Sequence, residues 1–198
     1  MHAWVAISKL FLIFILIIIS GASYAQNKFT NTFVLNFTND LSLERKNWLI
    51  VNDSVMGGLT NSDIDLEVGK LVFAGKLSLK NNGGFASVRR RLIDNETNQA
   101  DYVKLIIKGD GRAYKIRFRL NGYLDGLAYE QTIQTKLNVV DTYVLHEKDF
   151  EAVYRSRIFN GDDAFDLQDA LQFEIMLTDK NEGEFYLELI ELNFLTNK

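Results

Sequence analysis

The chain has 198 residues, no cysteine, no proline and a formal net charge of −4. The absence of cysteine excludes disulfide bonds and thiolate metal sites. The mildly acidic balance argues against a nucleic-acid-binding protein, which needs clustered cations to replace counterions. The length suits one domain of ordinary size with a substantial hydrophobic core.

The N-terminus has the layout of a secretory signal peptide. Lys9 precedes an unbroken apolar run at residues 10–19, and small residues surround Ala25. We therefore expect residues 1–25 to be removed by cleavage after Ala25, leaving residues 26–198 as a periplasmic or secreted domain. An uncleaved membrane anchor is the alternative, but a spanning helix needs roughly 20 apolar residues and this run is shorter.

Alternation of apolar and polar residues predicts short strands along the rest of the chain. The predicted strands cover residues 33–37, 48–51, 62–68, 71–79, 85–92, 102–108, 114–120, 129–136, 141–145, 171–177 and 184–195. A short helical turn or loop is expected at 41–47, irregular structure at 146–161, and a helical turn with an Asp cap at 166–171. The spacing of about 8–12 residues between strands predicts one all-β domain, a single antiparallel β-sandwich or barrel.

Three polar loops that contain glycine interrupt this pattern. They are Asn-Asp-Ser-Val-Met-Gly-Gly at 52–58, Asn-Asn-Gly-Gly at 81–84 and Lys-Gly-Asp-Gly-Arg at 108–112. Asn and Asp side chains bond nearby backbone amides, and glycine tolerates positive φ, so these are structured loops. Neither of the last two has the Lys-Ser/Thr or the following helix of a phosphate-binding loop.

In this order, the loops resemble the signature of a known family. Trp48 and the 52–58 motif, then Asn-Gly-Gly-Phe-Ala-Ser-Val-Arg at 82–89 and Gly-Asp-Gly-Arg-x-Tyr at 109–114, are similar to mitochondrial complex I intermediate-associated protein, the thirty-kilodalton assembly factor. The resemblance extends over about residues 33–195 and includes bacterial relatives. It implies a jelly-roll sandwich of the galactose-binding type, similar to some carbohydrate-binding modules.

The resemblance also implies a role without catalysis. Mitochondrial members assist assembly of NADH:ubiquinone oxidoreductase, and no catalytic residue or cofactor is established for the family. This chain departs from the family pattern at Val140, at His146-Glu147 and at Arg155-Ser156-Arg157, which puts a partner surface near 140–160 in question. The predicted signal peptide also separates it from a factor of the mitochondrial matrix.

Catalytic and metal-binding residues are scarce. The two histidines are His2, in the predicted signal peptide, and His146, so a triad or a zinc site is not expected. An esterase or glycosidase would need His146 or a close pair of carboxylates in a cleft. We therefore predict that the protein is not an enzyme and uses no cofactor.

A calcium site is the remaining metal alternative. Its oxygen ligands would come from the loop residues Asn52, Asp53, Asp110 and Asp179. No Asp-x-Asp-x-Asp-Gly spacing is present, and Asx turns that organise the loops are the simpler explanation. The sequence thus predicts no metal site.

A sheet face is the other candidate binding surface. Phe85, Ser87 and Arg89 point together on one strand, and Lys115, Arg117 and Arg119 on another; Tyr129 and Gln131 share a face of a third strand. If these strands are neighbours, they combine aromatic rings with guanidinium groups, as sugar recognition requires. The alternative is a solvent-exposed face whose cations prevent edge-to-edge pairing.

Two functions remain open at this point. The resemblance implies a non-catalytic module that binds a protein partner or assists assembly, and the fold type with its Arg/Tyr face suggests a carbohydrate-binding module instead. The candidate ligand- or partner-binding residues are Asn52, Asp53, Met56, Asn82, Phe85, Ser87, Arg89, Asp110, Arg112, Arg117, Arg119 and Tyr129.

Overall fold

The structure is a computed structural model that describes residues 29–123, 125–154, 157–159 and 165–197. The predicted signal peptide, its cleavage point after Ala25 and the Arg155-Ser156 step lie outside these residues. Within them the chain folds as two antiparallel sheets packed face to face, so the predicted all-β sandwich is confirmed.

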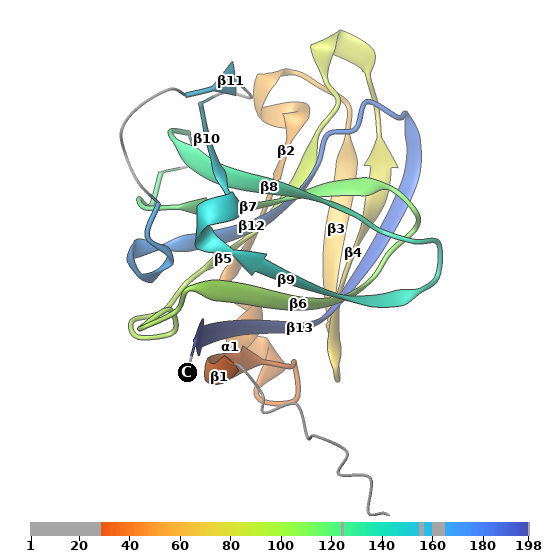
Figure 1. Cartoon of the computed structure of the whole chain (residues 1–198). Helices are drawn as coiled ribbons and strands as arrows, with labels where there is room; N and C mark the ends of the chain where they lie inside the picture. Colours follow the sequence, from red (N-terminus) through yellow and green to blue (C-terminus); the bar gives the residue numbers. More distant parts are fainter. Residues whose placement is uncertain (1–28, 124, 155–156, 160–164, 198) are drawn as a thin grey trace, which may run out of the picture.

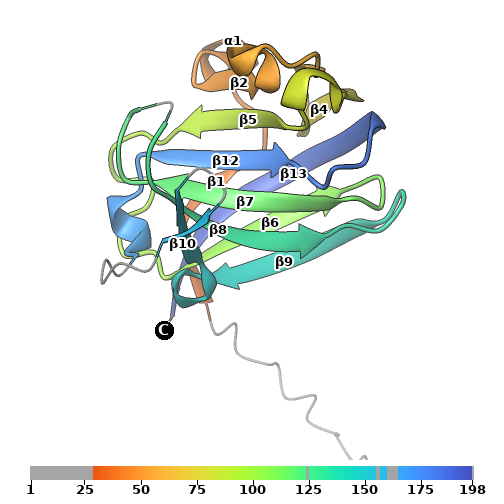
Figure 2. The same cartoon turned by 90° about the horizontal axis from the view of Figure 1, so that it is seen from above.

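The two sheets are built from strands that are distant in sequence (Figures 1 and 2). Sheet A has the order β3-β4-β13-β6-β9, with β1 also pairing with β13. Its strands are β1 (Phe29–Leu35), β3 (Asn61–Glu67), β4 (Lys70–Leu77), β6 (Tyr102–Lys108), β9 (Val140–His146) and β13 (Gly183–Asn197). Because β13 is long, its first half pairs with β4 and its second half with β1, while β6 lies along its other side.

Sheet B has the order β11-β10-β8-β7-β12-β5-β2. Its strands are β2 (Trp48–Asn52), β5 (Ala86–Arg91), β7 (Ala113–Arg119), β8 (Ala128–Gln134), β10 (Glu151–Tyr154), β11 (Arg157–Ile158) and β12 (Gln172–Leu177). The alternation in the sequence did not predict β10 and β11, which lie in the segment expected to be irregular. They are short edge strands, in which few residues form a pattern.

Short helices connect the strands. α1 (Leu41–Arg45) begins where the Asp40 carboxylate accepts the backbone N–H of Leu43 at 3.1 Å, and η4 (Leu167–Asp169) begins with the same kind of cap from Asp166. η4 confirms the predicted helical turn with an Asp cap, and α1 shows that the segment expected to be a helical turn or a loop is helical. The other turns are η1 (Asp53–Met56), η2 (Lys80–Asn82) and η3 (Glu147–Asp149). No described helix has the length and apolarity to span a membrane.

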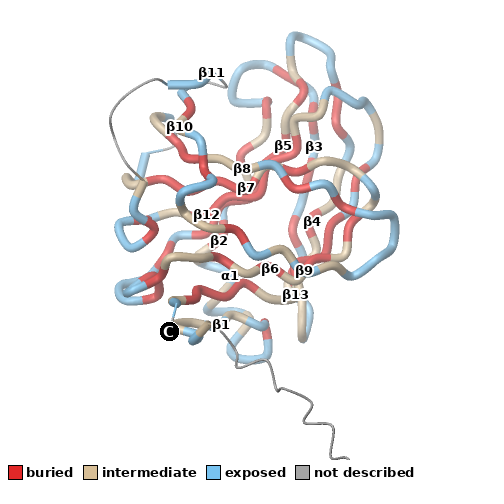
Figure 3. The backbone as a smooth tube through the Cα atoms, in the orientation of Figure 1, coloured by how far each residue is buried: buried red, intermediate tan, exposed pale blue. Residues whose placement is uncertain are grey.

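The core lies between the two sheets, as the burial pattern in Figure 3 shows. Phe118 of β7 has its ring centroid 5.6 Å from Phe173 of sheet B and 6.2 Å from Phe194 of sheet A, so aromatic rings join the layers. Trp48, which the family signature includes, is 4% exposed and packs edge-on against Phe173. With no disulfide available, this apolar layer supplies most of the driving force for folding.

A buried ion cluster closes the end of the sandwich beside α1. Arg90 is 1% exposed and forms two hydrogen bonds with each of two carboxylates, Glu44 of α1 and Glu96 of the β5–β6 loop, at 2.5–3.1 Å. The Trp48 indole N–H also donates to Glu44, at 2.7 Å. The Arg90 guanidinium lies 5.6 Å from the centroid of the Phe33 ring on β1. Arg90 therefore ties β1, α1 and β5 together around one paired charge.

We predict that Arg90→Leu lowers the free energy of unfolding by about 3–5 kcal/mol, because it leaves two carboxylates without their buried partner. Arg91→Leu is the matched control, since Arg91 is the exposed neighbour on the same strand; we expect a change within about 0.5 kcal/mol. Urea unfolding of both variants measures this. Equal losses in the two variants would contradict the role assigned to Arg90.

Candidate functional site

The 52–58 motif is organised by a buried carboxylate. Asp53 begins η1 directly after β2 and is 0% exposed. Its carboxylate accepts the backbone N–H groups of Thr60 at 2.9 Å, Gly84 at 2.6 Å and Phe85 at 3.3 Å, and also the Thr60 hydroxyl. The side chain predicted as a ligand contact therefore joins the β2–β3 loop to the β4–β5 loop.

The electrostatics of Asp53 follow from these donors. Burial on its own would raise the pKa of the carboxyl, but the hydrogen bonds from Thr60, Gly84 and Phe85 stabilise the charged form and lower the pKa below its ordinary value. All of these contacts are N–H or O–H donors to carboxylate oxygens, as an organising turn requires, and they engage both oxygens. Among the described residues, no group of three or more His, Asp or Glu side chains is placed to hold a metal ion.

Two glycines of the signature fit against Asp53. A Cβ on Gly58 would lie 2.3 Å from Asp53 Oδ1, and a Cβ on Gly83 would lie 2.5 Å from Oδ2. Gly57 adopts φ +87°, a left-handed conformation that favours glycine and ends η1. These three positions are explained by the internal geometry of the loops.

The Gly-Asp-Gly-Arg loop forms a second internal joint. Arg112 donates to both oxygens of Asp179, at 2.9 and 2.6 Å, and to the backbone carbonyl oxygens of Glu184 and Asn181. Asp110 accepts the Tyr114 hydroxyl at 3.1 Å and the backbone N–H of Tyr186 at 2.9 Å. Arg112 thus holds the β12–β13 connection in place, and Asp110 joins its own loop to β7 and β13.

The two joints meet at one end of the molecule. The Thr178 hydroxyl donates to the Gly84 carbonyl oxygen at 3.2 Å, and Lys180 Nζ donates to the same oxygen at 3.4 Å. Figure 1 shows the β2–β3, β4–β5 and β12–β13 connections together at the top of the view. We call this the signature end.

Apolar side chains project from the signature end. Val55 is 66% exposed, Met56 70%, Leu59 57% and Leu79 38%. The Asn81 side-chain amide donates to the Gly57 carbonyl oxygen at 3.1 Å, which joins the two loops that carry them. We call these four residues the apolar tip; it combines exposed apolar surface with loops held from beneath by Asp53.

The outer face of sheet B carries most of the remaining candidates. Strand register places Arg117, Glu174, Arg89 and Leu49 in one row across β7, β12, β5 and β2, and Arg119, Gln172 and Arg91 in the next row. Lys115, Ser87 and Met176 form a third row, and Glu130 on β8 continues the first. We call this surface the arginine face.

The charged groups of the arginine face are unusually buried. Glu174 is 0% exposed and Arg117, Arg119 and Arg89 are 5–7% exposed, although they point away from the core. Glu174 pairs with Arg89 at 3.1 Å and Arg119 at 3.4 Å; Arg117 and Lys115 pair with Glu130. Burial on its own would raise the pKa of Glu174, but the three guanidinium groups hold it below its ordinary value.

Two expectations about this face were wrong. Tyr129 pairs with the core residue Phe118, so its ring points inward, is 2% exposed and stacks on Phe165 at 4.6 Å between ring centroids. The predicted mixture of arginine and tyrosine on one face therefore does not form. The alternative of cations that guard an edge also fails, because β7, β12 and β5 lie in the interior of sheet B.

The other candidates are distributed between the two regions. Asn52 accepts the Ser62 hydroxyl at 2.7 Å, Ser87 donates to the Val51 carbonyl oxygen at 2.9 Å, and Phe85 is half-buried between the signature end and the arginine face. Asn82 is exposed at the signature end with φ +59°. His146 accepts the Lys148 backbone N–H and packs edge-on against Tyr102.

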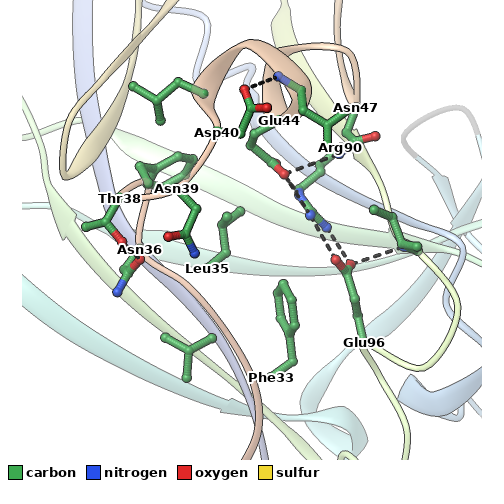
Figure 4. Close-up of a pocket in the computed structure, with 15 residues that line it drawn as sticks. Phe33, Leu35, Asn36, Thr38, Asn39, Asp40, Glu44, Asn47, Arg90 and Glu96 are labelled. Carbon is green, nitrogen blue, oxygen red and sulfur yellow. Dashed lines mark hydrogen bonds and ion pairs between the residues drawn. The ribbon is translucent and has the colours of Figure 1, made fainter.

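A pocket of about 330 Å³ lies elsewhere, between β1 and α1. Figure 4 shows Phe33 and Leu35 on one side and the Arg90–Glu44–Glu96 cluster on another. The surface that lines it is mostly apolar, although the side chains of Asn36, Thr38 and Asn39 also border it, and it includes none of the residues that the sequence nominated. The Arg90 guanidinium that reaches it is already held by both carboxylates and has little left to offer a ligand.

The fold belongs to a class found in carbohydrate-binding modules. The family 11 carbohydrate-binding module of Clostridium thermocellum in complex with a mixed-linked tetrasaccharide superposes with a TM-score of 0.57 at 18% identity, covering 81% of this chain and 94% of that one. The same module from the cellulase Lic26A-Cel5E gives 0.55 at 16%, covering 77% and 88%. An agarase gives 0.53 at 13%, covering 86% of this chain and 25% of the enzyme.

The sequence places the chain more narrowly. The profile of complex I intermediate-associated protein 30 matches residues 35–189. The chain therefore belongs to the complex I intermediate-associated protein 30 family, as its signature loops indicated. No curated protein matches it significantly in sequence.

Sequence reasoning missed the acidic partners of the arginine face and the Arg90 cluster. Arg90 lies on the same face of β5 as the core residues Ala86 and Val88, and this alternation indicates an arginine that points inward. Glu174 sits between the apolar residues Phe173 and Ile175 and gives no such signal. Which arginines surround it depends on strand order, which local patterns do not contain.

We predict that Asp53→Asn lowers the free energy of unfolding by about 3 kcal/mol, because a neutral amide cannot accept all the donors that the carboxylate holds. Asp63→Asn, an exposed position on β3, is the matched control and should change it little. Since the folded pKa of Asp53 lies below its ordinary value, its contribution to stability is present above the ordinary pKa and is lost as the pH falls through the folded pKa. We therefore expect the difference in the free energy of unfolding between wild type and D53N to become smaller as the pH is lowered, which urea unfolding at a series of pH values measures. A pH-independent gap would contradict the assignment.

A steric test uses the glycine beside Asp53. Gly58→Ala places a methyl group 2.3 Å from Asp53 Oδ1 and should lower the free energy of unfolding by about 1–3 kcal/mol. Gly122→Ala meets nothing within 4 Å and is the control. Thermal unfolding compares the two, and a G58A protein as stable as G122A would show that the loop has room to move.

Proposed function

We propose that the protein is a non-catalytic binding module that docks a protein partner at its signature end. The proposal rests on one observation: some residues of the 52–58 motif stabilise the loops internally, and others are exposed. Asp53, Gly57 and Gly58 serve internal geometry, whereas Val55 and Met56 are 66% and 70% exposed. A motif whose backbone is fixed by hydrogen bonds and whose two apolar side chains lie in solvent is suited to protein recognition, since a preorganised backbone presents apolar surface at low entropic cost.

The chemistry of the partner follows from the tip. Val55, Met56, Leu59 and Leu79 present no charge, so the partner should offer an apolar surface. Methionine is flexible and polarisable, which suits a surface of irregular shape. The family description, a protein associated with intermediates of complex I, supports a protein partner. Because the sequence predicts export, we place that partner in the periplasm or outside the cell.

A photo-crosslinking residue in place of Val55, in the full chain expressed in its own cells, tests the proposal. We expect a discrete crosslinked partner from position 55 and none from position 68, where Val68 is 80% exposed at the far end of β3. Burial of each apolar side chain contributes about 1.5–3 kcal/mol, so Met56→Ser with Leu59→Ser should weaken binding at least tenfold and abolish the product.

Val68→Ser is the matched control and should leave the product from position 55 unchanged. A product that survives the double variant, or one that forms equally from position 68, would contradict docking at the tip. Circular dichroism of each variant separates a lost contact from a lost fold.

A second function is favoured by a separate observation. The arginine face has the strand-based surface on which a module of this fold could hold a saccharide, and its polar groups are incompletely paired: among the described residues, Arg119 Nε has no hydrogen-bond partner. The family 11 carbohydrate-binding modules described above share this fold. We propose saccharide binding on the arginine face as the alternative function.

A further inference from the structure

The arginine face concentrates positive charge in a protein whose overall charge is −4. Its cations are Arg89, Arg91, Lys115, Arg117 and Arg119, and its carboxylates are Glu130 and Glu174, with the exposed Glu151 opposite Glu130 at the β10 edge. The cations outnumber the carboxylates even when Glu151 is included. The surplus must be balanced by solvent ions or by an anionic ligand.

The surplus is greatest in the row Arg119, Gln172 and Arg91. Arg119 is 5% exposed, and its Nη2 lies 3.4 Å from a Glu174 carboxylate that Arg89 also uses. Its Nη1 donates to the Gly126 carbonyl oxygen at 3.0 Å. Arg91 is exposed and forms no ion pair with any described residue. A buried guanidinium that shares one carboxylate is costly unless another anion completes its shell.

The same row also contains an acceptor. Gln172 Nε2 donates to the Asn121 carbonyl oxygen at 3.1 Å, an interaction that fixes the amide by its nitrogen and leaves the oxygen as an acceptor. Strands lie about 4.8 Å apart, so Gln172 has an arginine beside it on each neighbouring strand, Arg119 on β7 and Arg91 on β5. A ligand that matches the row carries anionic groups for the arginines and hydroxyl donors for the amide.

The position of the row limits how a ligand can bind. β7, β12 and β5 are interior strands whose backbone groups are already paired with one another. A peptide strand therefore cannot add to the sheet here by main-chain hydrogen bonds, which is how extended peptides usually join a sheet. Recognition must come from side chains alone, and it favours a ligand with many polar groups for its length.

We infer that Arg119, Gln172 and Arg91 bind an acidic saccharide, one that carries carboxylate or sulfate groups beside its hydroxyls. The inference deepens the alternative function and rests on it. Bidentate pairing of a carboxylate or sulfate with the exposed Arg91 guanidinium supplies affinity. Arg119 adds attraction through its positive charge, because both of its Nη atoms already bond the Gly126 carbonyl oxygen and Glu174. The Gln172 amide adds selectivity for hydroxylated ligands. Tyr129, the ring that the sequence placed on this face, belongs to the core and offers no platform for a neutral sugar.

Titration calorimetry on the full chain tests the inference with polygalacturonate and a sulfated galactan as acidic probes. Agarose oligosaccharides and mixed-linked glucan are the neutral probes, and polyglutamate and inorganic sulfate supply anions without sugar. We expect binding of at least one acidic saccharide that weakens as salt rises and that is at least tenfold tighter than polyglutamate or sulfate.

Arg91→Gln is the decisive variant, because Arg91 is exposed and its loss should leave the fold intact. It should weaken acidic-saccharide binding about tenfold, the loss of one good bidentate pair. Lys76→Gln removes the same charge from sheet A, where its side chain is 67% exposed, and should change binding less than twofold. Arg119→Gln should abolish binding, with urea unfolding to check its fold.

Each other result has a defined meaning. Neutral saccharides bound as tightly as acidic ones would keep the alternative function and overturn the acidic specificity. No response to any saccharide would overturn both. Equal binding of polyglutamate, or equal losses in R91Q and K76Q, would show that general electrostatics accounts for the attraction and would overturn the inference.

Discussion

The Asp53 carboxylate is the contact on which the signature end depends. Taking a carboxylate out of water is costly, and it is tolerated here because four donors from Thr60, Gly84 and Phe85 surround it. Those donors belong to two loops, and the sequence alone does not indicate that these loops are in contact. Once Asp53 joins them, Gly58 and Gly83 must be glycine, and the Gly84 carbonyl oxygen is positioned for Thr178 and Lys180. One buried charge thus fixes three connections in a protein that has no disulfide to do so.

The arginine face uses buried charge in the opposite way. At Asp53 and at Arg90 the donors and acceptors are matched, which is the pattern of a structural joint. On the arginine face one carboxylate, Glu174, serves two guanidinium groups, and burial together with the neighbouring Arg89 and Arg117 lowers the pKa of Arg119. The contrast within one molecule separates groups that complete the fold from groups that are still available to something outside it.

The sequence predicted the strands well because a sandwich strand with one buried face repeats every two residues. The same rule also predicts the orientation of Tyr129. It lies on the same face of β8 as Ile133, and both belong to the core, so the pattern of β8 alone indicates a ring that points inward. Other features were beyond local patterns. Arg90 meets Glu44 across 46 residues, and Glu174 meets arginines from strands on either side of it, so both contacts depend on strand order rather than on spacing. The family resemblance supplied the fold, but it could not say which signature residues face inward.

The separation of inward and outward residues within the signature bears on how function is assigned in this family. Asp53, Gly57, Gly58, Gly83, Asp110 and Arg112 all have internal explanations, so a match at these positions reports a stable loop architecture and carries no information about a ligand. Val55 and Met56 lie in the same motif and no internal packing accounts for them, because most of each side chain is in solvent. An exposed apolar pair held on rigid loops loses nothing internally when it is made polar. In the proposed protein-binding function this pair would make the external contact, and the hydrogen-bonded loops beneath it would fix where that contact lies.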